Sequence, residues 1–281
     1  MKMMKGVLLA LTPVTIYALY AYRFSAFILI LTSILTAVVA EAIYQKLAGK
    51  PIKINDLSAV VTGLLFSFTL SASTPLYAVI VSVAFGIIVG KQIFGGFGKN
   101  LFNPALMGRL FLIFAFPEAL SPWQERIDMV ATATPLTNFW DTGEMVSVSD
   151  AFLGRVPGSL GELSALLILL GGIYLIYKNY ARWRIPASVL ATVIIFSAVM
   201  GHNPLFHLFT GSVMIGSFVY ATDPMTSPRF PRAQIVFGIG VGLIVMVMRY
   251  WGWLAEGVAF GILTMNIFVP YLDNFFSSRS N

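Results

Sequence analysis

Several ionisable side chains lie in or beside long apolar runs of this sequence, where a charge is costly and is a functional candidate by default. By position they are Glu41, Asp56, Arg109, Asp223, Glu256 and Asp273. Carboxylates near both ends of apolar segments are what a path for cations needs, which makes Asp56, Asp223 and Glu256 candidates, with Arg109 as a candidate ion-pairing partner. The alternative is that these carboxylates are only interfacial residues at helix ends.

The composition places the chain in a lipid bilayer. Its 281 residues are 58% hydrophobic and 11% charged, with a mean hydropathy of +0.83, whereas a soluble domain carries about 25% charged residues. The formal charge of +6 is no sign of nucleic-acid binding, because Lys and Arg of membrane proteins gather on cytoplasmic loops. Without cysteine, the chain offers no disulfide, thiolate metal site or iron–sulfur cluster. We expect no metal site and no catalytic residues.

Apolar segments long enough to cross the membrane recur along the chain. A spanning helix needs roughly 20 mostly apolar residues, and about ten such segments are found, which predicts an all-α integral membrane protein. They lie near residues 6–22, 25–45, 57–72, 75–92, 103–118, 160–177, 185–201, 205–221, 233–249 and 253–271.

The positions of Lys and Arg predict the orientation of these helices. With the N-terminus inside, most of the 18 basic residues fall on one side, as the positive-inside rule requires. Both termini are then cytoplasmic, and the long loop at 119–159 lies outside.

Two Asn-Pro pairs, Asn103-Pro104 and Asn203-Pro204, suggest an internal repeat. Pro suits the first turn of a helix and Asn caps its free amides, so each pair predicts a half-helix whose positive end points into the membrane. Because the two pairs fall on opposite faces, we expect two five-helix repeats of inverted topology with broken half-helices, over 1–118 and 160–281. The alternative is that both pairs are ordinary helix starts at the membrane border.

The acidic loop at 119–159 is long for a connection, and long ordered loops are usually functional. It contains Asp128-Met129-Val130-Ala131-Thr132-Ala133-Thr134, followed by Pro135. The alternative is a solvated lid without chemistry.

Several segments together resemble one family, which comprises the RnfD component of the Rnf electron-transport complex and the NqrB component of the sodium-pumping NADH:quinone reductase. The similar stretches follow the family's order from end to end of the chain. They are residues 56–65, 94–105, the Thr134 loop, 222–228, 256–260 and Met265-Asn266. The compact N-terminus is more similar to the Rnf-type protein.

The resemblance implies a covalent flavin on the loop. The family's acceptor motif is similar to Asp-Gly-x-Ser/Thr-small-Ala-Thr, and its final Thr carries FMN as a phosphoester. Asp128, Ala133 and Thr134 match this motif, which makes Thr134 the expected acceptor and Asp128 a recognition element for a flavin transferase. Met129 and Ala131 depart from the motif, and Thr132 is the alternative acceptor.

The resemblance also implies a non-covalent riboflavin on the cytoplasmic side, near Asn100 and Asn103. An Asn side chain offers a donor and an acceptor, which suits the pyrimidine edge of a flavin. From the residues alone, both are equally well explained as helix caps.

The sequence is therefore interpreted as one component of an Rnf-type ion-translocating ferredoxin:NAD⁺ oxidoreductase in a prokaryotic inner membrane. It would pass electrons between neighbouring iron–sulfur and flavin subunits, coupled to Na⁺ or H⁺ movement, surrounded by lipid and without nucleic acid. A component of the sodium-pumping quinone reductase is the alternative within the family. From other classes, a small-solute channel with inverted repeats and a secondary transporter stay open, although neither needs a flavin anchor.

Overall fold

The computed structural model describes the chain except for residues 121–122, 125–130, 133, 253–256 and 278–281. Its regular structure is almost entirely helical. Two strands of two residues each, β1 (Trp123–Gln124) and β2 (Ala131–Thr132), pair antiparallel. The expectation of an all-α chain with several apolar helices is confirmed.

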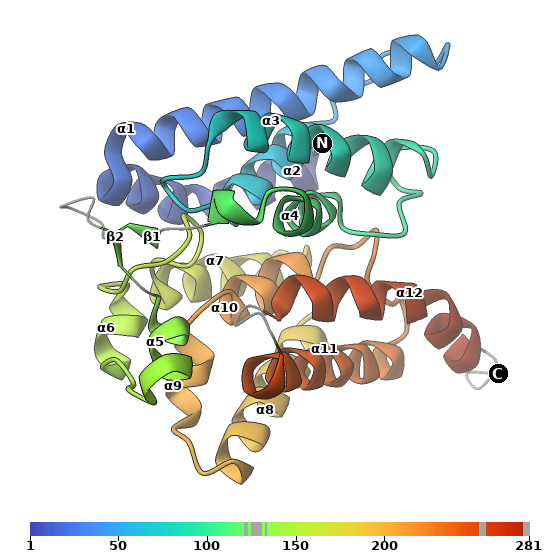
Figure 1. The fold of residues 1–281 in the computed structure, drawn as a ribbon. Helices are drawn as coiled ribbons and strands as arrows, with labels where there is room; N and C mark the ends of the chain where they lie inside the picture. The colour runs from blue at the N-terminus through green and yellow to red at the C-terminus, as the bar shows by residue number, and fades with distance from the viewer. Residues whose placement is uncertain (121–122, 125–130, 133, 253–256, 278–281) are drawn as a thin grey trace.

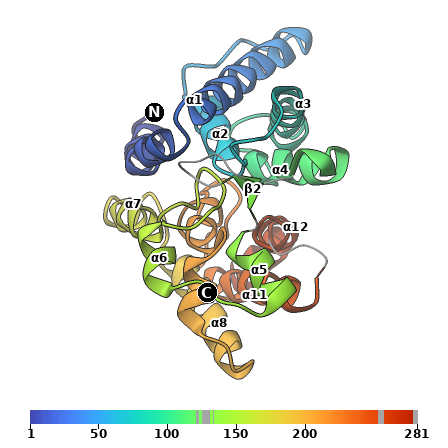
Figure 2. The ribbon, with the colours of Figure 1, turned by 60° about the vertical axis from the view of Figure 1, so that its left-hand side comes forward.

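The helices form two groups that lie one above the other (Figures 1 and 2). The first group contains α1 (Lys2–Leu47), α2 (Ser58–Ser67), α3 (Leu76–Ile87), the π-helical turn η1 (Ile88–Gln92) and α4 (Pro104–Ala115). The second contains α7 (Ala165–Tyr177), α8 (Arg184–Val199), α9 (Pro204–Phe209), α10 (Val213–Ile215), the π-helical turn η3 (Gly216–Tyr220), α11 (Pro231–Trp251) and α12 (Val258–Ser277). Between them in sequence come the 3₁₀ turn η2 (Pro117–Leu120), α5 (Pro135–Thr142) and α6 (Val148–Leu153).

Helix α1 consists of two arms joined at Arg23. This residue has φ 50° and ψ −125°, which interrupts the helix. The two arms correspond to the segments expected near 6–22 and 25–45, with the break at the expected residue. The corner lies beside the long loop, because Tyr17 donates to the Gly154 carbonyl (3.2 Å) and Tyr22 to the Gly158 carbonyl (2.7 Å).

Three of the described helices are long and apolar enough to cross a membrane, namely α1, α11 and α12. Other apolar helices are shorter. In α2, for example, the apolar segment continues beyond the end of the helix as irregular backbone. After α2 ends at Ser67, the next residues stay buried without forming a helix. Their carbonyls are satisfied from the second half of the chain: Leu160 N–H donates to Leu70 O (3.0 Å) and Gly161 N–H to Phe68 O (2.9 Å). Non-helical backbone is tolerated at membrane depth where protein buries it in this way.

Two glycines one turn apart bring the half-helix α4 close to α3. A Cβ on Gly86 would lie 2.4 Å from the Pro104 carbonyl oxygen, and one on Gly90 would lie 2.9 Å from Pro104 Cα. Small residues at this spacing let two helix backbones approach within a membrane. The start of α4 is therefore fixed against η1.

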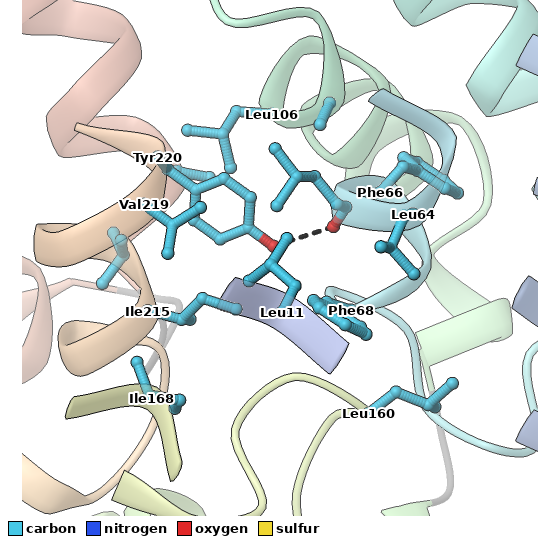
Figure 3. Close-up of a cluster of buried hydrophobic side chains, with 14 of the residues drawn as sticks. Leu11, Leu64, Phe66, Phe68, Leu106, Leu160, Ile168, Ile215, Val219 and Tyr220 are labelled. Atoms are coloured by element: carbon cyan, nitrogen blue, oxygen red, sulfur yellow. Dashed lines mark hydrogen bonds between the residues drawn. The ribbon is translucent and has the colours of Figure 1, made fainter. Parts of the chain in front are cut away.

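The core joins the two groups around Tyr220 of η3 (Figure 3). Its hydroxyl crosses between the groups to donate to the Leu65 carbonyl at 2.8 Å. Apolar side chains from both groups surround the ring, among them Phe66, Leu106 and Ile215, all of which are buried. The break after α2 and the π-helical turn η3 are thereby held together.

Candidate functional site

A cavity lies where the two helix groups meet, and we call it the Asn100 cavity. Its lining comes from α1, α2, η1, α7, the segment before α4 and the turn after η3. Most of its wall is apolar. The polar or charged lining residues are Ser58, Thr62, Lys91, Asn100, Asn103, Tyr180, Thr222 and Asp223.

Asn103 caps the half-helix α4, as the sequence predicted. Its Oδ1 accepts hydrogen bonds from the backbone amides of Ala105 (3.1 Å) and Leu106 (3.3 Å). Its Nδ2 donates to the Tyr220 carbonyl (3.4 Å) in the second helix group. Both polar atoms of the Asn103 side chain are therefore engaged within the protein. Asn103 lines the cavity but stabilises its wall.

Asn100 is different, because its amide is only partly used. Nδ2 donates to the Phe102 carbonyl at 3.3 Å, and the side chain is buried. Oδ1 accepts no hydrogen bond from any residue in the part of the chain that the structure describes. Leaving a buried acceptor unsatisfied costs about 1–3 kcal/mol, so this oxygen is suited to a donor on a bound molecule.

Asp223 lies in the turn after η3 and completes the polar wall. One carboxylate oxygen accepts the Met225 amide at 3.1 Å. Burial is the main influence on the group and raises the pKa of the Asp223 carboxyl above its usual value. The structure therefore brings together three of the predicted residues, Asn100, Asn103 and Asp223.

Thr134 lies in a second, separate cavity at the N-terminus of α5. Its Oγ1 accepts the Thr137 amide (3.2 Å) and shares a hydrogen bond with Thr137 Oγ1 (2.9 Å), so it is the N-cap of this helix. The side chain is 9% exposed, and Glu162 and Gly211 line the same cavity. Thr132, the alternative acceptor, lies in β2. Asp128 and Ala133 are outside the described residues.

Helix α5 is fastened to the second helix group through aromatic side chains. Trp140 donates its indole N–H to the Arg249 carbonyl at 2.5 Å, and Phe139 packs against His202, His207 and Tyr250. Arg249 is itself buried in α11. The docking fixes the direction in which α5 presents Thr134.

The remaining ion-path candidates lie in other places. Asp56 accepts hydrogen bonds from the Ser58 amide (2.8 Å) and hydroxyl (2.6 Å) at the start of α2, and lines a polar cavity with Glu41 and Lys53. Arg109 is buried in α4 and borders a small cavity with Ser212 and Tyr220. Glu256 is outside the described residues. The candidates therefore do not form one common site.

A buried pair is the feature that the sequence reasoning missed. Lys91 Nζ lies 2.6 Å from Glu41 Oε2, and both side chains are almost fully buried. Glu41 was noted only for its position, and Lys91, at the end of the apolar segment expected near 75–92, was counted only among the basic residues. Each interrupts an apolar run, Val38-Val39-Ala40 before Glu41 and Ile87-Ile88-Val89 before Lys91. These interruptions mark both charges as candidates, but no local pattern connects the two residues.

Comparison with known proteins places the whole chain in one group. The model of the NQR2, RnfD, RnfE family matches residues 1–281. The D component of the Na(+)-translocating ferredoxin:NAD(+) oxidoreductase complex of Acetobacterium woodii is 42% identical, over 98% of this chain and 89% of the relative. The D component of the proton-translocating ferredoxin:NAD(+) oxidoreductase complex of Clostridium ljungdahlii is 38% identical, over 98% of this chain and 89% of the relative. The D component of an ion-translocating oxidoreductase complex of Halorhodospira halophila is 33% identical, over 99% of this chain and 90% of the relative. The chain belongs to the NQR2, RnfD, RnfE family.

Proposed function

We propose that this chain is a membrane component of an ion-translocating ferredoxin:NAD⁺ oxidoreductase, in which it passes electrons between neighbouring subunits. The observation that carries the proposal is similarity over almost the full chain to the D components of such complexes. A family match from the first residue to the last favours this function over a channel or a transporter. The similarity to Rnf-type proteins favours it over a component of the sodium-pumping quinone reductase.

The helices are proposed to form ten membrane-crossing segments in two inverted halves, 1–118 and 160–281. Support comes from helix packing that recurs in equivalent order: α3 packs on α4 as α11 packs on α12, and α1 packs on α2 as α8 packs on α9. The Asn-Pro pairs give less support than expected. Asn103 opens the last helix of the first half, whereas Asn203 opens the broken segment of the second half.

Both termini are proposed to be cytoplasmic and the 119–159 loop extracytoplasmic, in a prokaryotic inner membrane. The corner of α1 lies against Gly154 and Gly158, so the loop and this corner share one end of the molecule. The basic residues at the end of α1 and just after it, Lys46, Lys50 and Lys53, lie at the far end of the second arm of α1. This arrangement agrees with the positive-inside rule.

Thr134 is proposed to carry FMN as a phosphoester, attached by a flavin transferase. A phosphate on Oγ1 would lie at the N-terminus of α5, where the Thr137 amide already donates to Oγ1 and the helix dipole favours an anion. The bound flavin supplies one- and two-electron chemistry, which the side chains of this chain lack. Trp140 and Phe139 keep the carrier helix in a fixed position.

A second, non-covalent flavin such as riboflavin is proposed to bind in the Asn100 cavity. Oδ1 of Asn100 offers the acceptor that a ring N–H requires, and the apolar side chains around it suit a flat aromatic ring. Asn103 fixes the cavity wall rather than the ligand. Asp223 is proposed to belong to the ion path at this cavity, with Asp56 and Glu256 as further candidates. Relatives carry both Na⁺ and H⁺ designations, so the coupling ion stays open.

The experiment is ion uptake by membrane vesicles that contain the complete complex. With reduced ferredoxin and NAD⁺, vesicles from a strain lacking this chain should neither reduce NAD⁺ nor accumulate ²²Na⁺ or protons, and the wild-type chain should restore both. NAD⁺ reduction and uptake that persist without the chain would contradict the proposal.

A further inference from the structure

The buried ion pair between Lys91 and Glu41 lies outside every role assigned so far. Lys91 Nζ donates to Glu41 Oε2 at 2.6 Å and to Ser58 Oγ at 2.6 Å. The side chains of Lys91 and Glu41 are 2% and 1% exposed. The pair joins three elements, since Glu41 comes from α1, Ser58 from α2 and Lys91 from η1.

Neighbouring amides hold the carboxylate from its other side. Gln92 Nε2 donates to Glu41 Oε1 at 2.9 Å, and Gln45 Nε2 donates to the same oxygen at 3.3 Å. Both carboxylate oxygens are therefore engaged. Lys91 itself belongs to a π-helical turn, a backbone distortion that is frequent at functional sites.

The pair separates two cavities of different character. Lys91 and Ser58 line the Asn100 cavity, whose wall is mostly apolar. Glu41 and Gln92 line the polar cavity that also contains Asp56 and Lys53. Phe97 borders both cavities, and the Lys91 ammonium lies 5.9 Å from its ring centre. The positive end of the pair therefore faces one cavity, and the negative end faces the other.

Fold stability alone does not explain such a pair. Removing two charges from water costs roughly what their attraction returns, so apolar replacements are often neutral or stabilising. An ionised Lys at membrane depth is instead a candidate for function. In an apolar cavity the electric field of the Lys91 ammonium is weakly screened. The ammonium therefore stabilises the negatively charged state of a molecule that is bound there.

We propose that Lys91 is a positioning residue of the electron-transfer site: its ammonium favours the reduced form of the flavin in the Asn100 cavity, and Glu41 sets how much of that charge reaches the cavity. The inference rests on the proposed second flavin. Asp223, which also lines the cavity, acts in the reverse sense when it is ionised. Reduction of the flavin takes up two electrons from a neighbouring subunit and one proton, and it leaves one negative charge on the ring. Lys91 stabilises that charge without forming a bond to the flavin.

The test is a spectroelectrochemical titration at pH 8, where the two-electron-reduced flavin is the anionic hydroquinone, of the full chain in lipid nanodiscs, in a Thr134→Ala background that leaves only the non-covalent flavin. Flavin content is measured first by acid extraction. In Lys91→Gln the ratio of reduced to oxidised flavin at a fixed potential should fall about tenfold, the change that a unit charge roughly 10 Å away produces at an effective dielectric constant of about 20. Lys91→Arg, which keeps the charge, should stay near the parent.

Two further variants test the direction of the change in this ratio, and a third is a control. Glu41→Gln exposes the full charge of Lys91 and should raise the ratio, while the double variant Glu41→Gln/Lys91→Gln should return close to the parent. Lys99→Gln, which removes an equal charge from an exposed position in the same segment, should change nothing.

Failure of the proposed second flavin and failure of the role of Lys91 give different results. A parent chain without extractable flavin contradicts the second flavin and the inference together. Flavin retained in all variants, but with unchanged ratios or with shifts of the same sign in Lys91→Gln and Glu41→Gln, overturns the inference alone.

Discussion

The backbone amide of Asn103 donates a hydrogen bond to Asn266 Oδ1 at 3.4 Å, although the two residues are 163 positions apart in the sequence. Asn266 belongs to α12 and is fully buried, and its Nδ2 also donates to the Thr226 carbonyl at 3.0 Å. One side chain thus connects the start of α4 with the turn that carries Asp223. The two halves of the chain share the wall of the Asn100 cavity through this residue.

Replacing Asn266 by Ala should destabilise the protein by about 2 kcal/mol or more, because a buried amide and a buried carbonyl lose their partner. Thermal unfolding in detergent should show a melting temperature several degrees lower. Asn274→Ala provides the matched control, since Asn274 is exposed on the same helix. Equal melting temperatures for the two variants would contradict the structural role of Asn266.

The sequence predicted those features that depend on short-range chemistry. Asn103 and Asn203 are N-caps because an Asn before Pro at a helix start is favourable wherever the helix lies. The break at Arg23 and the helical class were likewise predictable. The irregular backbone after α2 was not, because its carbonyls are satisfied by residues 160 and 161, and no local pattern reveals such a distant partner.

The candidate site was predictable only in part, for the same reason. Asn100 and Asn103 were named from the family resemblance and Asp223 from its position beside an apolar run, but their common cavity arises from contacts between the two helix groups. Lys91 was counted only among the basic residues that indicate orientation, and its partner Glu41 lies 50 positions away. The pairing of long-range charges has no periodicity that a sequence would display.

Asn100→Leu should reduce the non-covalent flavin content about tenfold, because one hydrogen bond of about 1–1.5 kcal/mol is lost with the Oδ1 acceptor. Acid-extractable flavin per chain, measured in the Thr134→Ala background, checks this. Asn274→Leu makes a similar change at an exposed position and should retain the flavin. Unchanged flavin in Asn100→Leu would place the binding site elsewhere.

Asp223→Asn should stabilise the protein at neutral pH. Burial raises the pKa of this carboxyl in the folded state above its unfolded value, so its contribution is most favourable below the unfolded pKa and is lost as the pH rises through the folded pKa. Asn keeps the acceptor for the Met225 amide but cannot ionise. Melting temperatures should therefore differ at pH 8 and converge at pH 4, and a larger gain at the lower pH would contradict this reasoning.

Trp140→Phe should loosen the docking of α5 without removing its apolar packing. The indole loses its hydrogen bond to the Arg249 carbonyl, and a loss of about 1–1.5 kcal/mol should speed amide hydrogen exchange within Pro135–Thr142 about tenfold. Exchange in α12 provides the internal control and should not change. Equal exchange in α5 of both proteins would show that the aromatic contacts of Phe139 suffice.

The most direct test of the covalent flavin is peptide mass spectrometry of the chain purified from cells that contain the flavin transferase. An added mass of one FMN less water is expected on Thr134, and it should be retained in Thr132→Ala and absent in Thr134→Ala. An unmodified Thr134, in cells that attach flavin to a control protein, would contradict the claim that this chain carries a covalent flavin.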